Sequence, residues 1–176
     1  MAACTATFPM TELSLLFVEH HRRVLKAAFR ITGNMADAED VAQAVFLRLA
    51  GADGPVANAG SYLYRAAING ALDLLRRRKN SQTEPLESAE YARAAGAGSS
   101  PEVEASGREL GALLRIAISE LPPRAAEMFI LRYVEEHGNR EIAVLMGTSQ
   151  AVVAVTLHNA RSRLKKRLSE FERGKR

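Results

Sequence analysis

The sequence of 176 residues predicts an all-α protein with two small helical domains joined by a flexible linker. Apolar residues recur at spacings of three and four in several segments, which is the pattern of helices with one buried face. Residues 80–107 are poor in large apolar residues and read as a linker between two groups of helices. We therefore expect an N-terminal helical domain over residues 8–79 and a four-helix, helix-turn-helix domain over residues 108–173.

The N-terminal domain is expected to contain three helices. The first spans residues 11–32, and the second begins at Asp37 with acidic residues in its first turn, where they suit the helix dipole. A loop rich in turn residues follows, and Ser61 opens the third helix. The polar face of the second helix carries Asp37, Asp40, Gln43, Leu47 and Arg48. An exposed leucine among polar side chains is typical of a docking surface, although single exposed leucines are also ordinary.

The third helix mixes aromatic and basic residues beside its buried stripe. These residues are Tyr62, Tyr64, Arg65, Asn69, Arg76, Arg77, Arg78 and Lys79. Proteins bind single-stranded nucleic acid with rings that stack on unpaired bases and with cations that follow the backbone. The mixture therefore predicts contact with unpaired nucleic acid. The alternative is that the tyrosines seal the core and the arginines keep the helix soluble.

Residues 139–168 read as a helix-turn-helix. Gly147 stands where the first of its two helices must stop, a place that favours a residue tolerating a left-handed backbone. Ser149 follows as a candidate N-cap for the second helix. Val153 and Leu157 of the second helix are expected to face inward and to pack on the first helix.

The second helix of such a motif lies in the DNA major groove. With the cap Ser149, the residues expected at the DNA are Gln150, Ala151, Ala154, Val155, His158 and Arg161. Gln150 can pair with adenine, and Val155 can touch a thymine methyl. The basic residues from Arg161 to the end of the chain are expected to attract phosphates. The alternative for this segment is a plain solvated helix.

Composition narrows the class of protein further. A net charge of +4 and a pI near 9.5 favour an acidic partner such as nucleic acid. The single cysteine, Cys4, cannot form an internal disulfide, and no apolar run is long enough to span a bilayer. We therefore expect a soluble, cytoplasmic protein without membrane insertion. No nucleophile with a base, carboxylate pair, metal-ligand set or cofactor loop is recognisable, so we expect neither an enzyme nor a bound cofactor or metal.

Four segments together resemble the bacterial sigma factors of RNA polymerase, in the small extracytoplasmic-function (ECF) group of the sigma-70 family. These segments occur in the family's order and spacing at residues 37–49, 63–78, 120–135 and 140–164. The resemblance implies a fold of two helical domains. It also implies core RNA polymerase and promoter DNA as partners. Because many members of this group are held by an anti-sigma protein, the resemblance allows for such a partner here.

The resemblance assigns a role to each surface. The second helix, with Asp37, Asp40, Gln43, Leu47 and Arg48, would dock on the coiled-coil clamp of core polymerase. The loop from Gly54 to Gly60 would capture and unpair the minus-ten promoter element together with Tyr62, Tyr64, Arg65 and Asn69, next to the basic Arg76 and Arg77. The helix-turn-helix would read the minus-thirty-five element.

Two other readings share some of these features. A two-domain repressor or activator would have the same helix-turn-helix and would bind DNA without being a polymerase subunit. An adaptor that sequesters another regulator would need neither basic cluster, and its binding would be nearly independent of salt.

Overall fold

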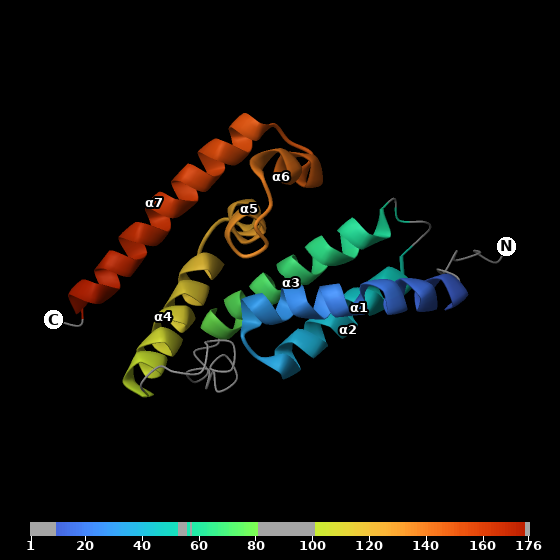
Figure 1. Cartoon of the computed structure of the whole chain (residues 1–176), viewed down its shortest axis with the longest axis horizontal. Helices are drawn as coiled ribbons and strands as arrows, with labels where there is room; N and C mark the ends of the chain where they lie inside the picture. Colours follow the sequence, from blue (N-terminus) through green and yellow to red (C-terminus); the bar gives the residue numbers. More distant parts are fainter. Residues whose placement is uncertain (1–9, 53–55, 57, 81–100, 175–176) are drawn as a thin grey trace. The chain divides into compact units, whose positions relative to one another are not determined.

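The structure is a computed structural model, and it describes residues 10–52, 56, 58–80 and 101–174. Within these residues the chain forms seven helices and no strand, which confirms the all-α prediction (Figure 1). The helices are α1 (Met10–Thr32), α2 (Met35–Ala50), α3 (Ala59–Asn80), α4 (Pro101–Ser119), α5 (Pro123–Tyr133), α6 (Asn139–Met146) and α7 (Gln150–Gly174). Cys4, Gly54 of the predicted base-binding loop and residues 81–100 of the predicted linker lie outside the described residues.

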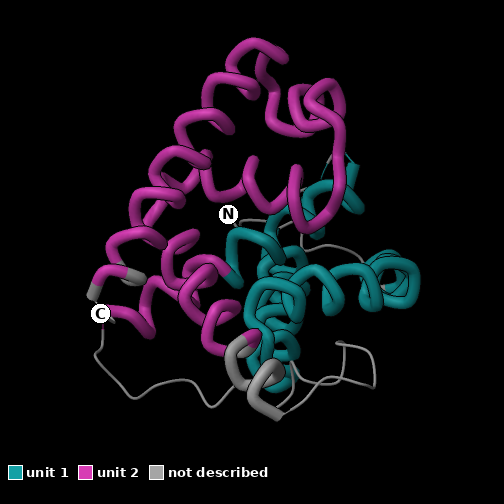
Figure 2. The backbone as a smooth tube through the Cα atoms, turned by 60° about the vertical axis from the view of Figure 1, so that its left-hand side comes forward, with its two compact units in different colours: residues 1–71 teal, residues 72–176 magenta. Residues whose placement is uncertain are grey.

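The chain divides into two compact units, residues 1–71 and residues 72–176 (Figure 2). Unit 1 contains α1, α2 and the first part of α3. Unit 2 contains the end of α3 and the four helices α4 to α7. The division falls inside a continuous helix, whereas the sequence placed a domain end near Lys79.

Gly33 and Asn34 form the junction between α1 and α2. Gly33 has a φ of 70°, a left-handed conformation that glycine tolerates, and α1 ends there. The side-chain oxygen of Asn34 then accepts a hydrogen bond from the Asp37 amide at 3.1 Å and caps α2. Because Asn34 is the cap, α2 begins at Met35, two residues before the predicted start.

The start of α3 follows the same principle. The side-chain oxygen of Asn58 accepts a hydrogen bond from the amide of Ser61 at 3.1 Å, and Asn58 has a φ of 57°. Asparagine adopts this left-handed conformation more readily than most residues. The helix therefore begins at Ala59, and Ser61 lies inside its first turn.

The core of unit 1 is built from small and branched side chains that let three helices approach closely. Its buried residues are Val24, Ala27, Ala28 and Ile31 of α1, Ala38, Val41, Ala42, Val45, Phe46 and Leu49 of α2, and Leu63, Tyr64, Ala67, Ile68 and Ala71 of α3. A Cβ placed on Gly70 would lie 3.2 Å from Cγ1 of Val41, so α2 and α3 meet where α3 has no side chain. This close packing fixes which faces of α2 and α3 remain outside.

The core of unit 2 joins α4, α5, α6 and α7, as predicted for a four-helix domain. Its buried apolar residues are Ala117, Ile118, Leu121, Ala126, Met128, Ile130, Leu131, Ile142, Ala143, Met146, Val153, Leu157, Ala160 and Leu164. Pro123 occupies the first turn of α5, where its missing amide costs no hydrogen bond. Leu110 and Leu114 of α4 continue the apolar spacing of this helix but are exposed.

Candidate nucleic-acid interface

The turn of the helix-turn-helix forms as the sequence predicts. Gly147 ends α6 with φ 58° and ψ 49°, and the Thr148 amide donates to the Ala143 carbonyl at 2.9 Å, which closes the last turn. Ser149 Oγ accepts a hydrogen bond from the Val152 amide at 3.3 Å and caps α7.

Among the described residues no single helix is long and apolar enough to cross a membrane. Only α6 and α7 taken together reach that length and apolar character, and they are bent by 105° at the turn between them.

One face of α7 is anchored in the core, and the other is left exposed. Val153 and Leu157 are buried, as predicted, and Ala160 and Leu164 continue the buried stripe. The exposed residues of the first three turns include all of those expected to face base edges: Gln150, Ala151, Ala154, Val155, His158 and Arg161. The structure therefore brings the six side chains to the outer side of one rigidly held helix. That these side chains contact DNA remains a prediction.

The rest of α7 carries exposed cations over more than one side. Arg161, Arg163, Lys165, Lys166 and Arg167 are all exposed. A helix with several exposed cations attracts the phosphates of a duplex whatever its sequence. Arg167 also has protein partners, because its guanidinium binds the carboxylate of Glu120.

Two residues near the turn were missed by the sequence reasoning. Arg124 of α5 donates from Nη2 to the carbonyl of Met146 at 3.1 Å, which satisfies a free carbonyl at the end of α6. Val144 of α6, within the motif, is exposed. The position of Val144 on the polar side of α6 could have been found from helical spacing, but the contact of Arg124 with α6 depends on the fold.

The structure divides the predicted minus-ten residues of α3 into two groups. Tyr62, Arg65 and Asn69 are partly exposed, and Arg77 is exposed. Tyr64 is only 3% exposed, and the guanidinium of Arg23 lies 4.4 Å from the centroid of its ring. A ring held in this way cannot stack on a base unless it leaves the core. We therefore correct the sequence interpretation of Tyr64, which supports the surface from inside.

Arg76 is also held by the protein. Its Nη1 donates to Oδ1 of Asp73 at 2.7 Å, and its Nε donates to the carbonyl of Ser119 at 3.1 Å. Its Nη2 is buried, with no hydrogen-bond partner among the described residues, and the whole side chain is 23% exposed. In this structure most of the Arg76 guanidinium is therefore engaged by the protein, whereas its neighbour Arg77 is exposed.

The predicted docking face of α2 is mostly exposed. Asp40, Gln43, Leu47 and Arg48 lie on the outside of the helix, and Leu47 is 65% exposed. Asp37 is buried in the first turn, where its amide is capped by Asn34. We therefore correct the placement of Asp37, whose carboxylate is not part of the exposed face.

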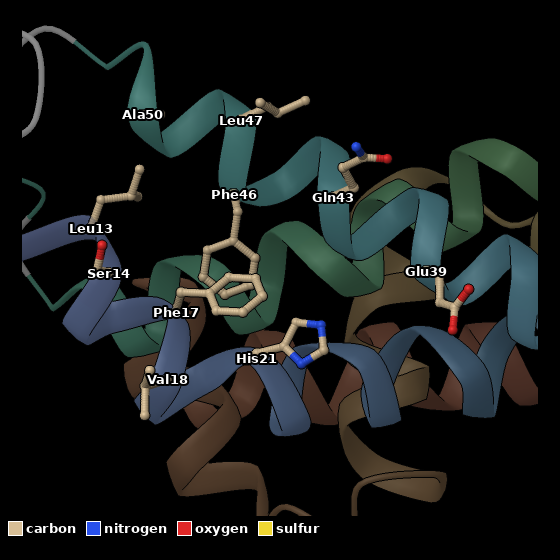
Figure 3. A pocket seen from close by; sticks show the side chains of 10 residues that line it. All are labelled: Leu13, Ser14, Phe17, Val18, His21, Glu39, Gln43, Phe46, Leu47 and Ala50. Atoms are coloured by element: carbon tan, nitrogen blue, oxygen red, sulfur yellow. The ribbon is translucent and has the colours of Figure 1, made fainter. Parts of the chain in front are cut away.

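An apolar groove of about 650 Å³ lies beside this face, between α1 and α2 (Figure 3). It is lined by Leu13, Ser14, Phe17, Val18 and His21 of α1 and by Glu39, Gln43, Phe46, Leu47 and Ala50 of α2. The rings of Phe17 and Phe46 lie side by side in the groove, with centroids 4.9 Å apart and planes tilted by 59°. Phe17 follows the apolar spacing of α1, but its side chain is 45% exposed where it lines the groove.

These features define a protein with a helix-turn-helix, the motif whose second helix lies in the DNA major groove, and with a second exposed helical face on α2. Two family models match the chain in the same places. The model described as Sigma-70 region 2 matches residues 16–81, which hold α1, α2 and α3. The model described as Sigma-70, region 4, matches residues 112–164, which hold the helix-turn-helix.

Two relatives agree with these matches. The ECF RNA polymerase sigma factor SigE of Mycolicibacterium smegmatis is 30% identical over 154 residues, which cover 86% of this chain and 60% of that protein. The RNA polymerase sigma-E factor of Streptomyces avermitilis is 31% identical over 150 residues, covering 82% of this chain and 78% of that protein. The crystal structure of the extracytoplasmic function sigma factor SigJ of Mycobacterium tuberculosis is similar with a TM-score of 0.46 and 20% identity, covering 86% of this chain and 52% of that one.

The chain belongs to the sigma-70 family of RNA polymerase sigma factors, in its extracytoplasmic-function group. It spans less than two thirds of the Mycolicibacterium relative and more than three quarters of the Streptomyces one.

Proposed function

We propose that this sigma factor binds core RNA polymerase and directs it to promoters by recognising minus-thirty-five and minus-ten elements and by helping to melt the latter. The observation that carries the proposal is the exposed face of α2, a helix whose opposite face is buried in a closely packed core. The same chain also contains a helix-turn-helix. A repressor or activator that acts without polymerase would account for α7, but it would not need this docking face.

The docking face combines an apolar centre with charges. Leu47 offers the apolar side chain that a partner can desolvate, and Asp40 and Arg48 offer charges of both signs that can orient the partner. Because α2 is packed along its buried face, the backbone that carries the four exposed side chains is held in place before binding. The coiled-coil clamp of core polymerase is the proposed partner of this face.

The proposed reader of the minus-thirty-five element is the first half of α7. Gln150 and Val155 would contact base edges in the major groove, and Arg161 would contact a phosphate or a guanine. Ser149 would position the helix through its cap. Cations farther along α7 would add sequence-independent affinity for the duplex.

The proposed site for the unpaired minus-ten element is the exposed side of α3. Tyr62 would stack on a base, while Arg65, Asn69 and Arg77 would contact the backbone or base edges. Taking a base out of the stack costs a few kcal/mol. Binding to polymerase and to the upstream duplex would offset that cost by holding α3 at the place where the base emerges.

Several further parts of the proposal follow from the family. The protein would act by binding, without catalysing a reaction, and it would work in the cytoplasm, where polymerase and DNA are. An anti-sigma protein that covers one of these faces would keep it inactive.

The experiment that tests the function is transcription by core RNA polymerase from supercoiled genomic promoter fragments, with and without this protein, followed by sequencing of transcript starts. New starts that share two upstream sequence elements are expected. If polymerase gains no start site and does not co-purify with the protein, the sigma-factor function fails. The helix-turn-helix would then belong to a repressor or activator.

A further inference from the structure

His20 of α1 fills the space beside Gly60 in the first turn of α3. A Cβ placed on Gly60 would lie 2.9 Å from Cε1 and 3.1 Å from Nε2 of His20. Carbon atoms in good contact are about 3.5–4.0 Å apart, so a side chain at position 60 would collide with this ring. Both residues belong to unit 1. The imidazole therefore packs directly on the backbone of α3.

The ring of His20 is held in this place by its surroundings. Its side chain is only 18% exposed. His20 stands four residues before the buried Val24, and side chains at this spacing share one face of a helix. Three residues after His20, the guanidinium of Arg23 lies over the ring of Tyr64, so α1 contacts α3 a second time. A side chain added at position 60 is therefore expected to displace the start of α3 rather than the ring.

Gly60 is tied to the residues on either side of it. The side-chain oxygen of Asn58 accepts a hydrogen bond from the Ser61 amide, and its carbonyl accepts one from the Tyr62 amide, both at 3.1 Å. These two bonds make residues 58–62 one connected turn. Because Gly60 lies inside this turn, Tyr62 moves with it.

The displacement that a side chain at position 60 would cause is large enough to affect base binding. Restoring an ordinary carbon–carbon contact from 2.9 Å requires a shift of roughly 0.6–1.1 Å. Residues that bind a ligand function when they are held within about 0.5 Å of their productive geometry. A shift of this size at Gly60 would carry Tyr62 beyond that tolerance.

We propose that His20 is a positioning residue for the minus-ten site. Its ring fixes the place of the first turn of α3, and through the backbone at Gly60 it fixes the position of Tyr62. The missing side chain of Gly60 is what lets the ring reach that backbone. This inference rests on the proposed function, in which Tyr62 stacks on an unpaired base.

The first test measures binding of a single-stranded oligonucleotide by core polymerase that carries each full-length variant. The oligonucleotide contains the minus-ten element that the transcript starts identify, and the variants are His20→Ala, Gly60→Ala and the two combined. At equal concentrations of folded protein, Gly60→Ala is expected to bind about fivefold or more weakly than wild type, the value of a weak base–aromatic stack. His20→Ala should also weaken binding, because the first turn of α3 loses its support.

The combined variant tests whether the two residues act through each other. Its new methyl group enters the space that the ring has left, so it should bind at least about twofold more tightly than Gly60→Ala, the smallest coupling expected between residues in contact. If the effects of His20→Ala and Gly60→Ala simply add, the proposal is overturned.

Ile31→Val is the matched control. Ile31 is buried in the same core and lies about 16 Å from His20 along α1, so its truncation weakens unit 1 away from the start of α3. It should bind the oligonucleotide as tightly as wild type. Gly60→Ala binding as tightly as Ile31→Val would reject the proposal. If Gly60→Ala does not fold, His20→Ala is compared with Ile31→Val instead, and equal binding rejects the proposal.

Urea denaturation tests the contact without polymerase or DNA. Gly60→Ala should lower the midpoint more in the wild-type chain than in the His20→Ala chain, because only the wild-type chain contains the ring. An equal drop in both chains would overturn the contact on which the proposal rests. Failure of the proposed function is a different result, because the wild-type protein would then give no start sites while the midpoints would still report whether His20 and Gly60 are coupled.

Discussion

Arg23 of α1 lies over the ring of Tyr64 of α3, with its guanidinium carbon 4.4 Å from the ring centroid. A cation in this position is attracted by the face of the ring, and the contact ties α1 to α3. Tyr64 is thereby part of the core of unit 1. Tyr62, two residues earlier, is partly exposed, and it is the ring that we propose stacks on a base.

The two tyrosines should therefore respond differently to truncation. Tyr64→Ala is expected to lower the free energy of unfolding by about 3 kcal/mol, because it leaves a cavity in a closely packed core. Tyr62→Ala should lower it by less than about 1 kcal/mol, since partly exposed sites tolerate substitution. Urea denaturation measures both changes. In transcription assays at matched folded concentration, Tyr62→Ala should reduce promoter melting more than Tyr64→Phe, and the opposite order would contradict the assignment.

Substitution by alanine is expected to lower stability at Gly147 and to raise it at Gly111. Gly147 has a φ of 58°, and a Cβ added there would meet no atom within 4 Å, so Gly147→Ala should destabilise unit 2 through the backbone alone, by about 1 kcal/mol. Gly111 lies inside α4, where a Cβ would have only an ordinary contact, so Gly111→Ala should stabilise by about 0.5–1 kcal/mol. Thermal unfolding of the two variants and the wild type measures both changes in stability. A Gly147→Ala protein as stable as Gly111→Ala would refute the role given to the turn.

The features that the sequence predicted well are local ones. The left-handed Gly147 and the cap at Ser149 depend on a few neighbouring residues, and the inward stripe of α7 depends only on helical spacing. Asn58 as a cap was missed because Ser61 is also a good candidate three residues later. The choice between two caps depends on the conformation of the loop, which spacing does not determine.

The exposed surfaces were predicted less completely, because the exposure of a side chain depends on which neighbouring helix packs over it. Tyr62 and Tyr64 lie two residues apart on α3, but Tyr64 is buried against Arg23 whereas Tyr62 is partly exposed, and helical spacing alone did not separate their roles. Arg76 is one of three successive arginines, and one of its two partners, the Ser119 carbonyl, lies 43 residues away in the sequence. Phe17 fits the apolar spacing of α1, but it lies at the edge of the core and lines the groove.

Leu47 should be important for polymerase binding and unimportant for folding. It is 65% exposed, so Leu47→Asp should change the free energy of unfolding by less than about 0.5 kcal/mol. A charge placed at the apolar centre of the docking face should weaken binding to core polymerase by about tenfold or more. Leu15→Asp is the matched control, since Leu15 is exposed on α1 but does not line the groove. Co-purification with core polymerase that is equal for the two variants would remove Leu47 from the docking face.

The contribution of Glu120 to stability should depend on pH in a defined direction. Its folded-state pKa is lowered, because hydrogen bonds from Lys79 and Arg167 outweigh the effect of burial. A group of this kind stabilises the folded protein above its unfolded pKa, and the contribution disappears as the pH falls through the folded pKa. The difference in unfolding free energy between wild type and Glu120→Gln, about 1 kcal/mol or less for an exposed pair, should be constant near neutral pH. Below pH 4.5, the ordinary value, the difference should shrink. Urea denaturation over a pH series measures it, and a difference that grows on acidification would contradict the ion-pair assignment.

The two kinds of contact on α7 should be separable by salt and by sequence. Arg163 is an exposed cation of the phosphate-binding kind, so Arg163→Ala should weaken binding to all duplexes alike and reduce the slope of log affinity against log salt by about 1. Gln150 is expected at a base edge, so Gln150→Ala should leave that slope unchanged. The promoter fragment is compared with one in which a single base pair is changed. At the base pair that Gln150 contacts, Gln150→Ala should reduce the difference in binding free energy between the two fragments by about 1–3 kcal/mol. Binding of full-length variants to the promoter fragment at several salt concentrations measures both quantities. If Gln150→Ala changed the salt slope and left discrimination intact, Gln150 would be a backbone contact, and the reading face of α7 would have to be placed elsewhere on its first two turns.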